Sequence, residues 1–311
     1  MKTILDIVKE RDNFPYHDCN RPSDYTQYTD NLWHFYLPDD PRPHGYIPHF
    51  VIETMPWTSE FYLDLSSNPK RLQLLADTPT AANAAIARVL QTAREKNLFK
   101  CLKGWRNEGY RILGARSDIK IERAGAGLFG IITVGAHMTV FTRSRTTRQI
   151  QIWVPTRSMS TTTSPGMLDS SVAGGVPMGV EPFECLVKEA REEASLPEEL
   201  TRRCAKAVGC VTEFSVKGDA QLEPSVKYVY DMEVDENIEL RPGDSEVEGF
   251  RLMTVEEVIK RVLEGMYKPM SAMVIIDFFV RHGILTIQNE RDYVEIVART
   301  HRFLPFPTSS E

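Results

Sequence analysis

The 311-residue chain contains few cysteines, and they are not arranged in pairs. No two of the five form a CxxC motif, and their odd number and scattered spacing are typical of free thiols in a reducing compartment. They are Cys19, Cys101, Cys185, Cys204 and Cys210. For Cys185 we expect a role as a small filler in the core.

Long apolar runs are absent as well. The most apolar late segment, residues 270–280, is short and contains Asp277, so it predicts a buried helix rather than a membrane span. The N-terminal residues MKTILDIVKERDNF reach charged side chains too early to supply the apolar core of a secretory signal. We therefore expect a cytoplasmic protein with no membrane partner.

Positive charge is not in excess either. The formal net charge of −6 argues against a nucleic-acid partner. The length suits two domains, and 42% hydrophobic residues is enough for ordinary cores. We expect a smaller α+β domain over residues 1–125 and an α/β domain over residues 126–311, while the oligomeric state is left open.

In the first domain, hydrophobic periodicity predicts two helices and a strand. One helix covers residues 3–11, and a second covers residues 81–96 with Asp77 or Thr80 as its cap. The alternating residues around Phe61 predict a strand. The pattern is that of an α+β domain.

In the second domain, strands alternate with helices. The strand over residues 149–158 is expected to break at Pro155, and Thr254 with Glu257 three residues later is a capping box. The other expected elements are strands over 208–216, 226–234 and 249–253 and helices over 254–264 and 267–282. Helices on both faces of a mixed sheet make an α/β/α sandwich.

Two other patterns suggest binding sites and are rejected. Residues 125–130 match G-x-G-x-x-G, but a dinucleotide site needs a helix to follow, and the next residues are β-branched and alternating, so strands are expected on both sides of the match. His34, His44 and His49 lie in one aromatic segment, but their spacing fits no helical or zinc-finger pattern. We expect structural or surface histidines.

The most informative stretch is GGVPMGVEPFECLVKEAREEASL, residues 174–196. At 100° per residue, Glu189, Glu192 and Glu193 fall within about a 100° arc of one helix, beside an apolar arc that docks the helix on a core. These like charges repel at the core's edge, and a divalent cation reverses that effect. Oxygen-rich sites suit Mg²⁺ or Mn²⁺. The pattern predicts a metal site for phosphate chemistry.

The same stretch resembles the Nudix box, G-x5-E-x7-R-E-U-x-E-E-x-G-U, where U is aliphatic. The match runs from Lys188 to Leu196 and keeps both acidic steps. Lys188 stands where the family has Arg, Ser195 stands where it has Gly, and the preceding loop is one residue shorter. Val180 occupies the position of the first Glu. We expect Glu181, which follows it at the start of the helix, to take over its role.

The resemblance extends over nearly the whole chain and singles out one subgroup. The segments WVPTRS, PGMLDSSVAGG, KYVYDMEV, EVEGFRLMTVEEV and IIDFFVRHGILT resemble the fungal and plant Nudix group that also occurs fused to thiamine pyrophosphokinase. RPHGYIPHFV and LFKCLKGWRNE are similar to the domain of unknown function at its N-terminus. The resemblance implies a Nudix α/β/α sandwich. Members of the group are associated with hydrolysing thiamine diphosphate or its damaged analogues.

For the reaction, the resemblance implies Mg²⁺, with Mn²⁺ as a possible substitute. Glu189, Glu192 and Glu193 are the expected ligands and catalytic groups, with the Gly174 carbonyl as a further ligand carried over from the family. An acidic residue outside the box often completes such a site. Glu246 and Glu248 are the candidates, with Glu248 chosen as catalytic, and the alternative for both is a charged strand end.

On the substrate side, Arg157 in WVPTRS is expected to bind a phosphate, with a solvated charge at a strand end as the alternative. The first hypothesis is therefore a Mg²⁺-dependent pyrophosphohydrolase that converts thiamine diphosphate or a damaged analogue to the monophosphate plus phosphate. A second hypothesis changes the small-molecule substrate to a nucleoside diphosphate derivative. A third is a non-catalytic Nudix-fold binding module, which the Val180 departure favours.

Overall fold

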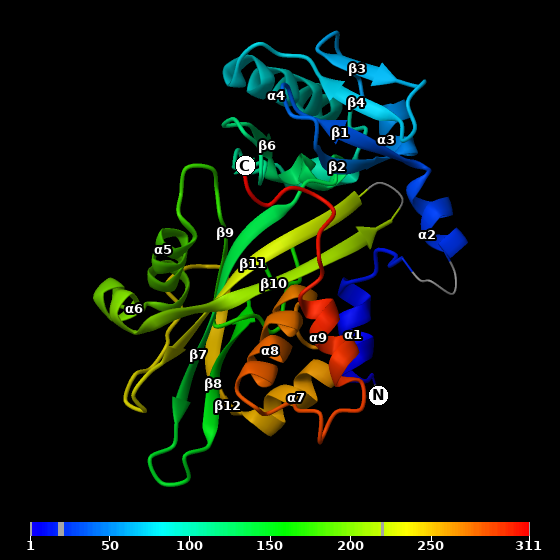
Figure 1. Ribbon diagram of the computed structural model, residues 1–311. Helices are drawn as coiled ribbons and strands as arrows, with labels where there is room; N and C mark the ends of the chain where they lie inside the picture. The colour runs from blue at the N-terminus through cyan, green and yellow to red at the C-terminus, as the bar shows by residue number, and fades with distance from the viewer. Residues whose placement is uncertain (1, 18–21, 219–220, 311) are drawn as a thin grey trace.

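The computed structural model describes residues 2–17, 22–218 and 221–310 and shows two units, one above the other in Figure 1. Cys19 lies outside the described residues. The first unit holds a four-stranded sheet and a small hairpin, and the second holds a six-stranded sheet. The expected architecture, an α/β/α sandwich with a mixed sheet after a smaller α+β unit, is confirmed.

The sheet of the first unit has the strand order β2-β1-β4-β3. β1 and β4 run parallel, whereas the other neighbouring pairs are antiparallel. The strand expected near Phe61 is confirmed as β3. The bounds are β1 (Leu32–Tyr36), β2 (Pro43–Pro48), β3 (Phe61–Asp64) and β4 (Arg71–Leu74).

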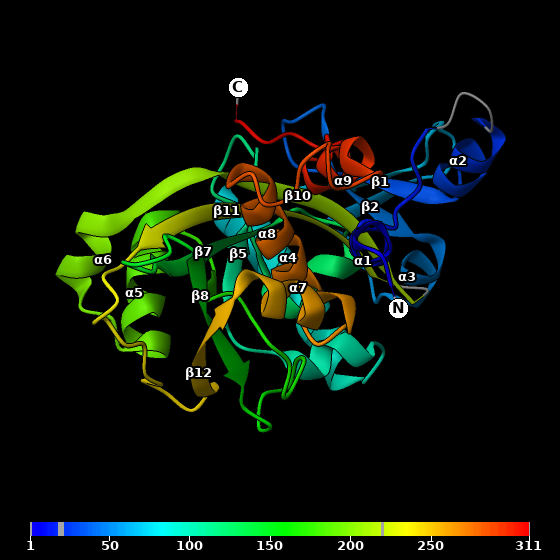
Figure 2. The ribbon, with the colours of Figure 1, turned by 90° about the horizontal axis from the view of Figure 1, so that it is seen from below.

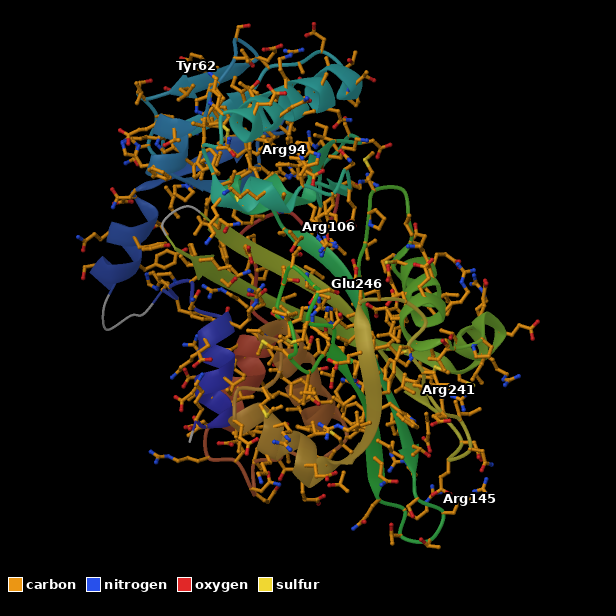
Figure 3. All side chains as sticks on the ribbon, turned by 180° about the vertical axis from the view of Figure 1, so that it is seen from behind. Tyr62, Arg94, Arg106, Arg145, Arg241 and Glu246 are labelled. Carbon is orange, nitrogen blue, oxygen red and sulfur yellow. The ribbon has the colours of Figure 1, made fainter. Side chains whose placement is uncertain are left out.

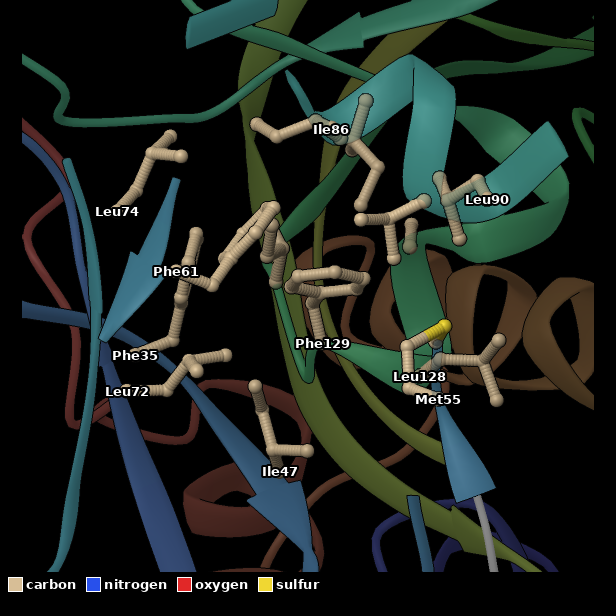
Figure 4. Packing of buried hydrophobic residues seen from close by; sticks show 14 of the residues in the cluster. Phe35, Ile47, Met55, Phe61, Leu72, Leu74, Ile86, Leu90, Leu128 and Phe129 are labelled. Atoms are coloured by element: carbon tan, nitrogen blue, oxygen red, sulfur yellow. The ribbon is translucent and has the colours of Figure 1, made fainter. Parts of the chain in front are cut away.

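Helix α4 (Pro79–Glu95) packs its apolar face on this sheet. Ile86 and Leu90 join Phe35 and Phe129 in one buried cluster, as Figure 4 shows. The helix begins two residues earlier than expected, and its cap is Thr78, whose Oγ1 accepts the N–H of Ala81 at 3.2 Å, rather than Asp77 or Thr80. Pro79 explains the difference, because proline fits the first helical position.

The rest of the first unit consists of short elements. They are α2 (Pro22–Thr29), α3 (His49–Thr54), η1 (Lys100–Gly104), β5 (Gly109–Arg111), β6 (Lys120–Glu122) and η2 (Arg123–Leu128). The 3₁₀ helix η2 covers most of the G-x-G-x-x-G match, and strand β7 follows it instead of the helix that a dinucleotide site needs. The strand expected from residue 128 onward is wrong for its first residues, because Gly130 turns the chain with a φ of +59°.

The second sheet has the order β10-β11-β7-β8-β12, and β9 pairs with part of β7. β11 and β7 are parallel, and the other pairs are antiparallel. The bounds are β7 (Thr133–Arg143), β8 (Ile150–Arg157), β9 (Val172–Gly175), β10 (Ala205–Lys217), β11 (Gln221–Glu233) and β12 (Val247–Thr254). The expected break at Pro155 is wrong: β8 continues, because its pairing with β7 ends at Ile152 and no strand bond needs the missing N–H on that side.

Helices cover both faces of this sheet, as Figure 2 shows. Ala136 and Met138 of β7 face the core shared with α5, whereas Phe141 faces the core shared with α8. The helices are α1 (Ile4–Arg11), α5 (Pro182–Ala194), α6 (Glu198–Cys204), α7 (Val255–Leu263), α8 (Pro269–Arg281) and α9 (Tyr293–Thr300). The capping box of Thr254 and Glu257 is confirmed. Across the described ranges, no helix combines the length and apolar character that a membrane crossing needs.

Both ends of the chain cross between the units. Val8 of α1 lies in the same core as Phe278 of α8, so the first helix packs with the second unit. The C-terminal segment returns to the first unit, where a Cβ on Gly114 would lie 2.3 Å from the Pro307 carbonyl oxygen and Arg42 donates to the Ser309 carbonyl at 3.1 Å. The division near residue 125 stays a prediction, with α1 packed on the far side of it.

The three histidines of the first unit have separate partners. The ring of buried His44 bonds to Asp40 at 2.9 Å, and the ring of His34 packs on Tyr46. His49 is exposed and pairs with its helix neighbour Glu53. Their structural and surface roles agree with the expectation from spacing.

Candidate active site

Helix α5 carries the three glutamates to the edge of the second sheet. Its apolar residues Leu186, Ala190 and Ala194 are fully buried against β7 and β9. Because the glutamates occupy the neighbouring arc, they emerge beside strand β9 rather than in open solvent. Cys185 is buried as expected, and its thiol donates to the Gly175 carbonyl at 3.2 Å.

Glu189 lies directly over Gly174. A Cβ on this glycine would come within 2.5 Å of Glu189 Cγ, so the position admits no larger residue. Burial raises the pKa of Glu189, Lys188 opposes the rise, and the nearby carboxylates of Glu192, Glu246 and Glu108 add to it. The packing of the Glu189 side chain on β9 therefore depends on a glycine at position 174.

Glu193 lies at the free edge of β9. Its Oε2 accepts the N–H of Ala173 at 3.0 Å. Burial raises the pKa of this carboxyl well above its usual range, and Asp169 and Glu189 add to the rise, whereas the Ala173 N–H and Lys268 oppose it. A carboxylate in this position is costly in the absence of a cation.

Glu192 pairs with two cations of its own helix, and it shares one of them, Lys188, with Glu189. Its carboxylate pairs with Lys188 at 3.2 Å and with Arg191 at 3.4 Å. Consistent with this, the described part of the chain contains no group of three carboxylate, histidine or cysteine side chains close enough to hold a metal ion together. The three glutamates share one helix, but the side chain of Glu192 is more exposed than that of Glu189, 39% against 22%, and it is held by Lys188 and Arg191.

A cavity of about 500 Å³ opens beside this edge, between the two units. It borders Ala173, Gly174 and Gly175 of β9, and its described lining contains six lysines and arginines but one carboxylate. The cations are Arg11, Arg106, Arg123, Lys217, Lys227 and Lys268, and the carboxylate is Glu223. Such a surface attracts anions, above all groups with several charges.

Four of these six cations have an acidic partner. Arg11 pairs with Glu213 at 2.9 Å, Lys217 with Glu223 at 2.6 Å, Arg123 with Glu108 at 3.0 Å, and Lys268 with Asp169 at 3.1 Å. Among the described residues, Lys227 and Arg106 have none within ion-pair distance. The cavity therefore keeps a positive excess.

Lys227 owes its place in the cavity to a glycine opposite. It pairs in register with Gly135, and a Cβ there would come within 2.9 Å of the lysine stem. Burial lowers the pKa of Lys227 to about 7, which Glu213 opposes and Arg11 assists. His137 lies two residues along β7, and burial lowers its pKa to about 3.

Arg157 is not placed where its expected role requires. It is buried, its Nη1 donates to Asp169 at 2.8 Å, and its Nε donates to the Thr163 carbonyl at 3.1 Å. Asp169 also accepts bonds from Lys268 and Ser271. Since Arg157 does not line the cavity, its contacts indicate that it positions Asp169, and through it Lys268, instead of meeting a phosphate itself.

The two acidic candidates outside the helix are both exposed. Glu246 lies near Glu189, whose pKa it raises, and it lines a smaller hollow of about 340 Å³ together with Trp105 and Arg106. Figure 3 shows Arg106 and Glu246 at the junction of the two units. The larger and smaller hollows share Arg106 in their linings, so they lie next to each other. Of the pair, Glu246 rather than Glu248 is found beside the helix glutamates.

Val180 and Glu181 lie at the start of α5. Val180 is 38% exposed, and Glu181 occupies the N-cap without a side-chain capping bond. Burial raises the pKa values of Tyr228 and Tyr230, and the nearby Glu181 carboxylate adds to both rises. This position, on the side of β11, counts against a role for Glu181 beside Glu189.

Sequence reasoning missed the cationic lining. Lys227 lies in the long strand β11, Arg106 lies in the loop between η1 and β5, and Arg123 begins the short 3₁₀ helix η2. They form a recognisable site only because the fold brings them together at the Gly174–Gly175 end of β9. The nearest signal was the set of small residues, such as Gly135, that leave room for long side chains.

Comparisons with known proteins identify two domains in the chain. The Nudix domain model matches residues 135–273, and a model named "Domain of unknown function (DUF4743)" matches residues 45–133. An uncharacterised protein of Saccharomyces cerevisiae is 32% identical over 98% of this chain and 92% of its own length. Nudix hydrolase 20, chloroplastic, of Arabidopsis thaliana is 33% identical over 73% of this chain, which spans 60% of that relative.

Among solved structures, a protein of Deinococcus radiodurans matches 55% of this chain and 83% of its own, with 22% identity and a TM-score of 0.34. The family assignment rests on the domain matches and the sequence relatives. The chain contains a Nudix domain preceded by a DUF4743 domain, and Nudix hydrolases are among its relatives.

Proposed function

We propose that this Nudix hydrolase is a Mg²⁺-dependent pyrophosphohydrolase that converts thiamine diphosphate, or a damaged or oxidised analogue, to the monophosphate plus phosphate. One observation carries the proposal. Two half-buried glutamates with raised pKa values, Glu189 and Glu193, stand at the edge of a cavity with six cationic side chains. Carboxylates for a metal next to cations for phosphates are the parts that diphosphate hydrolysis requires.

The residues present fit a divalent cation. Glu189 and Glu193 are oxygen donors, and the Glu189 carboxylate raises the pKa of Glu193, so a bound cation would relieve the repulsion between them. Glu192 would join them by leaving Lys188, and the Gly174 carbonyl stays a proposed further ligand. When bound, Mg²⁺ would neutralise phosphate charge and polarise the phosphoryl group.

The remaining chemistry falls to the chain's own residues. Cleavage needs a water oxygen to bond to phosphorus, the P–O–P bridge to break, and a base to take the water's proton. Glu246, next to Glu189, is better placed as that base than Glu248. Lys227 and Lys268 would hold the phosphate groups, and the contacts of Arg157 with Asp169 would fix Lys268.

The thiamine part of the substrate is supported by two further points. The chain's segments resemble the group associated with thiamine diphosphate hydrolysis. The smaller hollow adds the indole of Trp105 and the carboxylate of Glu246, and both kinds of group attract a flat cationic ring. A diphosphate in the large hollow would leave this end for the heterocycle.

A phosphate-release assay over a diphosphate panel tests the proposal. Thiamine diphosphate and its oxidised analogues, ADP, and ADP-ribose are each incubated with Mg²⁺, Mn²⁺ or EDTA. We expect release from the thiamine compounds with Mg²⁺ and none with EDTA. Preference for the nucleoside compounds would replace the substrate, and no release from any compound would leave a binding module.

A further inference from the structure

The first unit covers the strand end at which the glutamates converge. A Cβ on Gly175 would lie 2.1 Å from the hydroxyl oxygen of Tyr110, and the N–H of Met178 donates to the Gly109 carbonyl at 2.9 Å. Strand β5 is therefore docked on the loop between β9 and α5. The two units are joined at the site itself.

This docking places arginines of the first unit in the cavity wall. The guanidinium of Arg123 lies 5.6 Å from the ring centre of Tyr110 and bonds to Glu108 at 3.0 Å, so two residues next to the docked loop orient it. Arg106 reaches the second unit, where it donates to the Thr162 hydroxyl at 3.5 Å. Both arginines line the cavity that borders Gly174.

The second unit contributes Lys227 to the same cavity. Its stem crosses Gly135, and a Cβ built on that glycine would also lie 3.1 Å from the Gly174 carbonyl oxygen. The lysine thus stands close to the strand end that meets Glu189. A half-buried ammonium group without an anionic partner costs free energy, and a bound anion would recover it.

We propose that Arg106 and Arg123 of the DUF4743 domain bind the diphosphate of the substrate together with Lys227, so this domain is a part of the active site. The inference rests on the proposed function for the identity of the substrate. All three cations line the larger cavity, where the diphosphate would bind whatever the organic group. The ligand class is a diphosphate ester of a small organic molecule.

The test measures binding separately from hydrolysis. Calorimetry in EDTA uses methylenediphosphonate, a diphosphate that water cannot cleave, as the probe. We expect Lys227→Met, Arg106→Met and Arg123→Met each to weaken binding about tenfold, the effect of one charge-assisted hydrogen bond. Arg123→Lys should recover part of the loss.

Two matched controls separate a local from a general charge effect. Arg111 lies on the same strand as Tyr110, pairs with Asp118 at 3.2 Å and is not in the cavity lining, and exposed Lys206 lies on β10 next to β11. Arg111→Met and Lys206→Met should bind the probe like the wild type. Should Arg123→Met fail to fold, Lys227→Met and Arg106→Met decide, since neither residue has an acidic partner among the described residues.

Two results would overturn the inference. One is a wild type that does not bind methylenediphosphonate at millimolar concentration, and the other is unchanged affinity in the Lys227 and Arg106 variants. Either result can occur while the wild type still hydrolyses thiamine diphosphate, in which case the proposed function stands and the role of the first domain fails. If the wild type binds methylenediphosphonate but hydrolyses no diphosphate, the proposed function fails and the role of the first domain in binding stands.

Discussion

Replacing Glu193 by Gln should stabilise the metal-free protein and remove most of the stabilisation by Mg²⁺. The folded-state pKa of Glu193 lies well above its usual value because the carboxyl is buried. Its contribution to stability is therefore present at acid pH and is lost as pH rises through the folded pKa. At neutral pH the wild type carries the cost of a charged, half-buried group.

The size of the effect follows from that position. One pKa unit corresponds to about 1.4 kcal/mol, so we expect a gain on the order of 1 kcal/mol in the free energy of unfolding for metal-free Glu193→Gln. The amide oxygen can still accept the Ala173 N–H that Glu193 accepts now. In the wild type, Mg²⁺ at about 100 times its dissociation constant should add roughly 2.7 kcal/mol.

Thermal melts with EDTA and with Mg²⁺ measure both effects. A gain of 1 kcal/mol raises the melting temperature by about 2–4 °C in a protein of this size range. Glu184→Gln is the matched control, because Glu184 lies on the same helix and is held by Arg202 on the surface. A Glu193→Gln variant that melts below the wild type in EDTA, and that keeps the full Mg²⁺ shift, would refute the reasoning.

Three further predictions follow from single residues. Because Glu181 lies near Tyr228 and Tyr230, Glu181→Ala should leave turnover unchanged. Val180→Glu should raise activity or Mg²⁺ affinity within the ~10–100-fold range of changes around a metal's ligands. Both variants are assayed at one Mg²⁺ concentration, and a large loss of activity in Glu181→Ala would contradict this prediction. Ser195 ends α5 in the left-handed conformation with a φ of +53°, which glycine adopts at lower cost. Ser195→Gly should therefore raise the free energy of unfolding by about 1 kcal/mol in urea titrations. A loss of stability would show that the hydroxyl group of Ser195 contributes more than the backbone strain costs. The pKa of Lys227 is about 7 in the folded state, below its unfolded value, so stability should rise with pH above about 7, and Lys227→Met should flatten that rise in melts from pH 6 to 10; an unchanged slope would place the titration elsewhere.

Local patterns predicted the elements whose formation depends on near neighbours. The capping box of Thr254, the amphipathic helix with Glu189, and the buried helix containing Asp277 all formed as expected. Periodicity and capping decide such segments within a few residues. The resemblance to the Nudix box supplied the chemistry of the same helix.

The features that the sequence did not predict depend on contacts between distant parts of the chain. The motif around Arg157 predicted that it binds a phosphate, but its buried bond to Asp169 depends on a loop that folds back over β8. Lys227 and Arg123 carry no local signal at all, because they meet only through the register of β11 with β7 and the docking of β5 on the Nudix loop. Long-range packing, which a single sequence does not display, made the cavity.

Turnover of thiamine diphosphate by a Glu192→Gln/Glu193→Gln double variant tests the central claim most directly. The measurement is phosphate release at saturating Mg²⁺, beside the wild type and the Glu184→Gln control, with melts to verify folding. Removing carboxylates that hold the metal should lower turnover at least ~10²-fold, the lower end of what one positioned catalytic group contributes. A folded double variant with the turnover of the wild type would contradict the assignment of this helix edge as the active site.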